Sequence, residues 1–353
     1  MRTETSLEID AAAISWLTTF TPRRFLGNGH LQTLAGNFLR RRFSLPAPES
    51  LIVEVEGPAA GYGASSVLCH CHWQPPEVRR ERLTVIIVHG LEGSSNSKYV
   101  LGNTARALAA GFNVVRMNMR SCGGTDDLSP TIYHSGRSED VAAVIARVIQ
   151  TEQVESIALI GYSMGANLVL KYSGEVAAAP PRQLKAVVGI SPLMDLAVSS
   201  AALHEPQNRV YEWHFLRSML ARVRRKAALF PKIYGTAALE KIRSMRLFDE
   251  HIVARYGGFT GADDYYYGVA SSKYAGQFRT PMLILHSLDD PFIRMLPATR
   301  DALVENPSVT YVETERGGHC AFLAPAKNDD GRWAESTLLS FLLGHANGSR
   351  LGR

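Results

Sequence analysis

The pentapeptide Gly161-Tyr162-Ser163-Met164-Gly165 constrains the fold of this chain more than any other feature. It follows the apolar run 157–160 and precedes the helix-like stretch 166–170, so the order is strand, Gly-x-Ser-x-Gly, helix. Both glycines are needed, because a side chain at either flank of so sharp a turn would collide with the neighbouring strand or helix. The turn exposes the serine hydroxyl at a helix N-terminus, where backbone N–H groups point toward developing negative charge. We therefore predict that Ser163 is a nucleophile.

Around this motif the sequence alternates between strand-like and helix-like segments. Predicted strands cover residues 51–56, 65–72, 84–88, 112–119, 157–162, 185–191, 281–286 and 309–313. Predicted helices cover residues 99–110, 138–150 and 333–345. The short apolar run within 84–88 is typical of a strand that is buried on both faces. The alternation predicts a mostly parallel central sheet with helices on both faces.

One long segment interrupts this alternation. Residues 192–279 are longer than a simple crossover, and a structureless connection of that length is improbable in a compact domain. We interpret them as a helical cap that is inserted after the sixth strand. The predicted organisation is an N-terminal arm packed on the core (1–50), an α/β core (51–191 and 280–353) and the cap (192–279).

The composition is that of an ordinary soluble globular protein, with 46% hydrophobic and 20% charged residues. No apolar run approaches the ~20 residues that a membrane span requires, and the N-terminus lacks the apolar core of a signal peptide. The four cysteines, at positions 69, 71, 122 and 320, show no disulfide-framework pattern. We therefore expect a cytoplasmic protein in a reducing setting.

Positive charge is concentrated in the predicted cap. Residues 201–260 hold 11 Lys/Arg and 5 Asp/Glu, a local balance of +6 in a chain whose net charge is +5. The densest part of this region is the cluster Arg222, Arg224, Arg225 and Lys226. We favour a solvated helix face; the alternative is a surface that attracts an anionic substrate or the headgroups of a membrane in peripheral contact. No aromatic-interleaved basic groove accompanies the cluster, so nucleic acid is not an expected partner.

A serine hydroxyl needs a general base in order to act as a nucleophile at neutral pH. His319 is the predicted base, because it follows the last predicted strand in the loop Gly317-Gly318-His319, where two glycines allow close approach to the serine. Cys320, which is next to it, is expected to be a small buried residue.

The base in turn needs an orienting carboxylate, which we expect at the carboxyl end of the strand 281–286. Asp289 and Asp290 are adjacent there, and a small-x-x-Asp-x-x-aliphatic spacing within 287–293 selects Asp290. Asp289 is the alternative, but it fits a turn-forming or surface residue better, because adjacent side chains do not normally point at the same imidazole. Asp195 is a more distant alternative. The chain order nucleophile, acid, base is the one expected of an α/β-hydrolase.

Hydrolysis of this kind also needs two backbone N–H donors for the oxyanion. The predicted donors are Met164, next to the nucleophile, and Leu91, in the turn after the strand 84–88. His89, which begins that turn, is expected to be a buried supporting residue and not a proton-transfer group.

The segment Cys69-His70-Cys71-His72 raises the question of a metal site. Strand alternation places the two cysteines on one face and the two histidines on the other, so four ligands cannot converge. Cys-x-Cys is also not the spacing of a zinc finger. We therefore predict no metal site and no cofactor.

Five segments carry further patterns: Gly29-His30-Leu31-Gln32-Thr33 within 25–34, and the segments 89–94, 118–124, 161–167 and 264–267. Together, and in this order, they resemble the signatures of the YheT-like α/β-hydrolases, over nearly the whole chain from about residue 20. The resemblance implies an α/β-hydrolase fold and a Ser-Asp-His hydrolase with a helical cap, in a family of carboxylesterases and acyltransferases that make or break medium-chain esters. We expect His30 to pack the arm against the core and to take no part in catalysis.

The predicted function is that of a serine esterase that cleaves small-molecule carboxylic esters, with short- to medium-chain acyl groups, through an acyl-enzyme. The alternative is acyl transfer to an alcohol with the same triad; the His-x4-Asp pattern of some related acyltransferases is missing here, since Leu323 and Ala324 stand at the fourth and fifth positions after His319. A non-catalytic binding protein is less favoured, because such proteins usually lack one triad member. Aromatic residues of the cap suggest an apolar acyl pocket: Tyr211, Trp213, Phe215, Phe230 and Tyr234.

Overall fold

The computed structural model describes residues 17–55, 63–237, 239–326 and 329–347. Eight strands in these residues form one sheet, in the order β1-β2-β4-β3-β5-β6-β7-β8. Their bounds are β1 (Glu49–Val55), β2 (Ser65–His72), β3 (Thr84–Val88), β4 (Asn113–Met117), β5 (Ile157–Tyr162), β6 (Leu184–Ile190), β7 (Met282–Ser287) and β8 (Val309–Thr314). The pairs β1–β2 and β2–β4 are antiparallel, and every pair from β4 to β8 is parallel. The predicted, mostly parallel sheet is thus confirmed.

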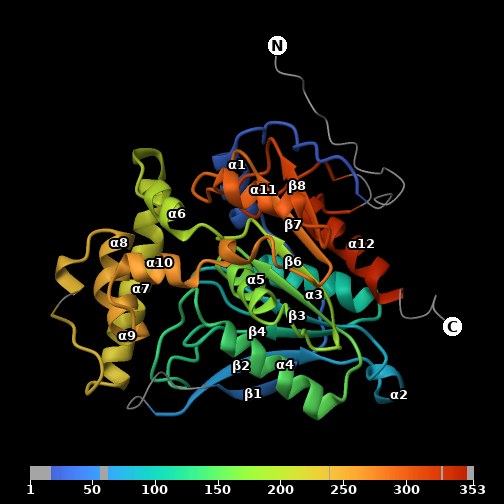
Figure 1. Ribbon diagram of the computed structural model, residues 1–353, viewed down its shortest axis with the longest axis horizontal. Helices are drawn as coiled ribbons and strands as arrows, with labels where there is room; N and C mark the ends of the chain where they lie inside the picture. The colour runs from blue at the N-terminus through green and yellow to red at the C-terminus, as the bar shows by residue number, and fades with distance from the viewer. Residues whose placement is uncertain (1–16, 56–62, 238, 327–328, 348–353) are drawn as a thin grey trace.

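Helices cover both faces of the sheet (Figure 1). They are α3 (Lys98–Ala109) and α12 (Trp333–Asn347) on one face, and α4 (Ser138–Glu152) and α5 (Met164–Glu175) on the other. β3 shows why both faces need cover. Its residues Val85 and Ile87 belong to the apolar cluster that includes α3 and α12, whereas Ile86 and Val88 belong to the cluster that includes α4 and α5. A strand with two buried faces needs apolar residues at consecutive positions.

The chain between β6 and β7 folds into helices that stand together beside the sheet, on the left in Figure 1. They are α6 (Leu196–Leu203), η1 (Pro206–Asn208), α7 (Arg209–Leu229), η2 (Leu239–Lys241), α8 (Met245–Phe248), η3 (Asp249–Ala254), α9 (Arg255–Gly257), α10 (Ala262–Val269) and η4 (Ser271–Tyr274). Most of these helices contribute to an apolar cluster of their own. We call this helical insertion between β6 and β7 the cap. Outside the cap, the described residues also form the short helices α2 (Pro76–Arg79) and α11 (Pro297–Glu305).

The N-terminal segment contributes one helix in the described residues, α1 (Gly29–Phe38), which lies near the top of the view in Figure 1. The side chain of Asn28 caps it by accepting hydrogen bonds from the backbone N–H groups of His30 and Leu31, at 3.0 and 3.3 Å. Such a cap satisfies N–H groups that have no partner inside the helix.

A buried ion pair fixes the end of this segment to α12. Both terminal nitrogens of Arg41 donate to the carboxylate of Glu335, at 2.6 and 2.7 Å, and the side chains are only 8% and 5% exposed. Burial raises the pKa of the Glu335 carboxyl, so the bidentate contact with Arg41 compensates a real desolvation cost.

We expect Arg41→Met to lower the free energy of unfolding by about 3 kcal/mol, because the substitution leaves the buried Glu335 carboxylate without its main partner. Urea denaturation measures the change. Arg40→Met is the matched control, since Arg40 is exposed and its loss should cost less than about 0.5 kcal/mol. Equal losses in the two variants would contradict a stabilising role of the pair.

Candidate active site

Ser163 stands in the sharp turn between β5 and α5. Its backbone is left-handed, with φ 55° and ψ −117°, a strained conformation for a residue with a side chain. The flanking glycines make the turn possible: a Cβ on Gly161 would lie 2.4 Å from the Cα of Ala166, and one on Gly165 would lie 2.3 Å from the carbonyl oxygen of His89. The turn therefore demands glycine at both positions.

Ser163, His319 and Asp290 form one hydrogen-bonded chain. The Nε2 atom of His319 is 3.0 Å from the Ser163 Oγ, and its Nδ1 atom is 2.7 Å from the Asp290 Oδ2. Because the carboxylate can only accept, Nδ1 carries the hydrogen in the neutral ring, and Nε2 is free to accept the proton of the serine. The structure thus brings together three residues that the sequence separates by up to 156 positions.

The surroundings of Asp290 keep its carboxyl ionised. Its second oxygen, Oδ1, accepts hydrogen bonds from the backbone N–H groups of Phe292 and Ile293, at 3.1 and 2.9 Å. Burial favours the neutral acid, but the interaction with His319 and these N–H groups outweighs burial and lowers the pKa of Asp290. Burial likewise disfavours a charged imidazole, yet the Asp290 carboxylate raises the pKa of His319 well above its usual 6.5.

The two alternative aspartates are engaged elsewhere. The Oδ1 atom of Asp289 accepts from the Ser287 hydroxyl at 2.5 Å and from the Gly318 N–H at 2.8 Å. Asp195 accepts from the N–H of Leu296 at 2.8 Å and from the Thr299 hydroxyl at 3.0 Å. Asp289 therefore ties two loops together, and it is Asp290 that faces the imidazole.

The N-terminal helix holds the loop that carries His319, which sequence reasoning did not foresee. The Thr33 hydroxyl oxygen accepts a hydrogen bond from the backbone N–H of His319 at 2.9 Å. The buried Gln32 amide bonds both the N–H and the carbonyl of Leu323, at 2.8 and 3.1 Å. A Cβ on Gly29 would lie 1.8 Å from the carbonyl oxygen of Asp289. Three residues of the Gly-His-Leu-Gln-Thr signature thus contact the loops of the acid and the base.

His30, in the same signature, packs differently from the expectation. Its ring stacks on Tyr211 of α7, with 5.7 Å between centroids, and its Nδ1 atom is 3.2 Å from the Tyr211 hydroxyl. His30 therefore joins α1 to the cap, whereas the sequence suggested packing against the core.

Leu91 and Met164 lie in the same cavity wall as Ser163. Met164 is the first residue of α5, so its N–H has no acceptor inside the helix. The turn around Leu91 is fixed by its neighbours: the Gly90 N–H donates to the Tyr99 hydroxyl at 2.8 Å, and the Glu92 N–H donates to the Tyr133 hydroxyl at 3.1 Å.

His89 is fully buried and bonded through both ring nitrogens. Its Nδ1 lies 2.8 Å from the Gly90 carbonyl oxygen, and its Nε2 accepts from the Met119 N–H at 3.1 Å. Burial lowers the pKa of His89 to about 4, so the ring stays neutral. This supporting position agrees with the sequence-based expectation.

Only half of the basic cluster of α7 is the solvated helix face that we favoured: Arg224 and Arg225 are exposed, whereas Arg222 and Lys226 are buried. Arg222 is 7% exposed and donates to the two carboxylate oxygens of Glu92, at 2.9 and 3.2 Å. Lys226 is fully buried, and its Nζ donates to the carbonyl oxygens of Asp126 (2.7 Å) and Ser129. Arg225 pairs with the Asp126 carboxylate at 2.9 Å. Arg222 and Lys226 therefore bind the cap to the core and are not available to an anionic substrate or a membrane headgroup.

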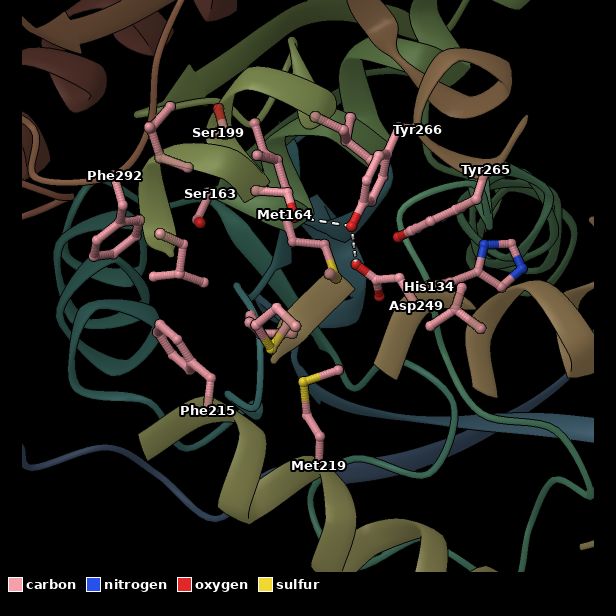
Figure 2. A pocket seen from close by; sticks show the side chains of 18 of the residues that line it. His134, Ser163, Met164, Ser199, Phe215, Met219, Asp249, Tyr265, Tyr266 and Phe292 are labelled. Carbon is pink, nitrogen blue, oxygen red and sulfur yellow. Dashed lines mark hydrogen bonds between the residues drawn. The ribbon is translucent and has the colours of Figure 1, made fainter. Parts of the chain in front are cut away.

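A mainly apolar cavity of about 80 Å³ adjoins Ser163, between the core and the cap (Figure 2). It has room for several water-sized groups. Of the five cap aromatics expected to line an acyl pocket, only Phe215 does so. Trp213 is 59% exposed, and Tyr234 is buried in the cap core. The remaining aromatic lining comes from residues outside that set, such as Phe292, whose ring centroid lies 4.5 Å from that of His319.

The remaining residues singled out in the sequence are the histidines and cysteines of β2, which lie away from Ser163, and Cys320, which lies next to His319. His70 and His72 bond Ser95 and Arg116, at 2.9 and 3.2 Å, on the face opposite the buried cysteines. In the described ranges, no three His, Cys, Asp or Glu side chains are grouped as a metal site would require. Cys320 is half-buried, not buried as expected, and its Sγ is 3.6 Å from the His319 Nε2.

Comparison with known proteins agrees with this architecture. The sequence profile described as the alpha/beta hydrolase fold matches residues 84–325. The chain is 30% identical over 338 residues to YheT of Escherichia coli (strain K12), named as a candidate esterase, covering 94% of this chain and 95% of that protein. It therefore belongs to the α/β-hydrolase fold family and, within it, to the YheT-like group.

Two further similarities extend this comparison. Phospholipase ABHD3 of Bos taurus is 28% identical over 243 residues, which cover 69% of this chain and 59% of that protein. The solved Pyrococcus furiosus esterase Pf2001 shares the fold, with a TM-score of 0.52 and 16% identity over 92% of this chain and all of that one.

Among the helices of the described residues, none has the length and apolarity to cross a membrane.

We expect Thr33→Val to lower kcat about tenfold with little change in KM, because it removes the acceptor for the His319 N–H while leaving the cavity wall intact. Steady-state kinetics with an ester substrate separate the two constants. Thr33→Ser keeps the hydroxyl and should restore most of kcat. A rise in KM alone, or a serine variant as slow as the valine variant, would show that Thr33 does not position His319.

Proposed function

We propose that the protein is a serine esterase that cleaves small-molecule carboxylic esters. The observation that carries the proposal is the chain Asp290–His319–Ser163, with the serine hydroxyl at the wall of an apolar cavity. A strained serine between a strand and a helix, a base within hydrogen-bond reach and a buried acid on its far side are the parts that acyl transfer through serine requires. The names of the two relatives, a candidate esterase and a phospholipase, agree with ester cleavage.

In the proposed reaction, His319 takes the proton of Ser163 as the hydroxyl oxygen attacks the ester carbonyl carbon. The oxyanion that forms accepts hydrogen bonds from the N–H groups of Leu91 and Met164. The tetrahedral intermediate then collapses, the alcohol leaves with the proton from His319, and an acyl-enzyme remains. Water repeats the sequence and releases the acid, while Asp290 holds the imidazole and stabilises its charged form.

The cavity favours an apolar acyl group of short to medium length. Phe215 and Met219 of α7, together with Met164 and Phe292, present hydrocarbon and sulfur to its interior (Figure 2). An apolar pocket gains free energy from each methylene that it removes from water, at about 0.8 kcal/mol, and a cavity of about 80 Å³ has room for several such groups. A cytoplasmic location stays a prediction.

We expect a fluorophosphonate probe to label the wild-type protein and to leave Ser163→Ala unlabelled, because the probe reacts with an activated serine hydroxyl. The same variant should lose ester hydrolysis by a factor on the order of 10⁶ in kcat. Cys320→Ala is the control, since Cys320 is the other nucleophile close to His319; it should still be labelled. Equal labelling of the wild type and Ser163→Ala would refute the assignment.

The kcat/KM of the wild type should fall as the pH drops through the pKa of His319, because only the neutral imidazole can accept the serine proton. The Asp290 carboxylate raises that pKa above 6.5, so the midpoint of the acid limb should lie above pH 6.5. Asp290→Asn should lower kcat by about 10³ to 10⁴-fold and move the midpoint downward. Asp289→Asn should keep the wild-type midpoint. A midpoint that moves with Asp289 and not with Asp290 would reverse the assignment of the acid.

A further inference from the structure

The wall of the cavity away from Ser163 holds a polar cluster, formed by Asp249, Tyr266 and Ser200. The Tyr266 hydroxyl donates to the Asp249 Oδ2 at 2.7 Å, and the Ser200 Oγ lies 2.8 Å from the same hydroxyl. The three residues come from η3, α10 and α6, so three separate elements of the cap converge on one point. Figure 2 shows the Asp249 carboxyl and the Tyr266 hydroxyl directed into the cavity, across from Ser163.

A carboxyl group in this position is costly for the fold. Asp249 is 7% exposed, and no Lys or Arg within the described ranges forms an ion pair with it. Arg246, whose charge lies nearby, uses its guanidinium on Asp263, at 2.8 and 2.9 Å. Burial consequently raises the pKa of Asp249 to about 7. A leucine in this place would continue the apolar wall without that desolvation cost, so the carboxyl serves something other than packing.

The hydrogen bonds of the cluster define what kind of group it can bind. Tyr266 gives its only hydroxyl hydrogen to Asp249, so Ser200 is the donor in the contact between Ser200 and Tyr266. The Ser200 hydroxyl therefore donates to Tyr266, and the Tyr266 hydroxyl donates to Asp249. Its other oxygen, Oδ1, accepts no hydrogen bond from the described residues, so Asp249 retains an acceptor in the cavity wall, and the matching ligand group is a hydrogen-bond donor.

We propose that Asp249, held by Tyr266 and Ser200, forms a polar subsite that binds a hydroxyl group on the acyl chain, so that hydroxyacyl esters are the preferred substrates. This inference rests on the proposed esterase function and adds the substrate class to it. The apolar part of the cavity wall, which includes Met164 and Met219, accommodates the methylenes that separate the ester carbonyl at Ser163 from the hydroxyl at Asp249. A hydroxyl is neutral, and so it enters an apolar cavity at a lower desolvation cost than an ammonium group.

The test compares two esters of nearly equal shape and length. In p-nitrophenyl 6-hydroxyhexanoate the chain ends in a hydroxyl, and in p-nitrophenyl heptanoate a methyl group takes its place. We expect the wild type to favour the hydroxy ester in kcat/KM, and we expect the ratio of the two values to fall about tenfold in Asp249→Leu. Repeating the pair at chain lengths two methylenes longer and shorter locates the hydroxyl along the cavity.

Tyr266→Phe and Asp249→Asn keep the shape of the wall and protect the test against a leucine variant that does not fold. Tyr266→Phe should reduce the ratio, because the carboxyl loses the partner that orients it. Glu240→Gln, which changes an exposed carboxyl elsewhere in the cap, should leave the ratio unchanged. Asp249→Asn should also lower the ratio, because the amide oxygen is needed by the Tyr266 hydroxyl and the amide then presents an NH2 donor in place of the second acceptor oxygen.

Two results would count against the subsite and are distinguishable from a failure of the esterase proposal. A wild-type preference for heptanoate, or a ratio that is the same in the wild type, Asp249→Asn and Tyr266→Phe, overturns the subsite while hydrolysis of both esters leaves the esterase function intact. Absence of hydrolysis of either ester, together with absence of fluorophosphonate labelling, overturns the esterase function and the subsite with it.

Discussion

The left-handed turn at Ser163 is the constraint on which the rest of the site depends. A strained residue of this kind costs about 1–3 kcal/mol and persists only where its surroundings hold it. Here β5 and α5 close on either side, and the contacts at Gly161 and Gly165 leave no space for a larger residue. A Cβ on Gly90 would lie 3.2 Å from the Cβ of Ser163, so the turn that contains Leu91 packs directly on Ser163. The hydroxyl and both candidate oxyanion donors are thus positioned by one set of close contacts.

The loop of His319 is held in another way. Its backbone is also strained, with φ 59° at Cys320 and 40° at Phe322, but it lies in the long loop between β8 and α12 and not in a tight turn between a strand and a helix. Distant parts of the chain bind it instead: Thr33 and Gln32 of the N-terminal helix, and the Ser191 hydroxyl, which accepts from the Cys320 N–H at 3.0 Å. The position of His319, the proposed base, therefore depends on long-range hydrogen bonds, whereas that of Ser163, the proposed nucleophile, depends on local packing.

This difference explains which parts could be predicted from sequence. The turn at Ser163 could be, because its glycines and its strand-to-helix setting are local. Asp290 and His319 could be proposed because parallel strands bring the loops at their carboxyl ends to one edge of the sheet. The partners of Arg222 could not, since Glu92 lies 130 positions away and Asp126 lies 96 positions away. A run of cations on a predicted helix gives no sign of acidic partners so far along the chain.

Helix α7 connects the apolar cavity to the turn that contains Leu91. Phe215, Met219, Arg222 and Lys226 are spaced by four, three and four residues in α7, so they share one face. Phe215 and Met219 line the cavity, Arg222 binds Glu92 next to Leu91, and Lys226 binds the loop after β4. A single helix thereby joins the wall of the cavity to the turn that holds the proposed oxyanion donor Leu91. Arg222 and Glu92 fix the register of that helix against the turn, and the register decides where the apolar cavity wall lies relative to Ser163.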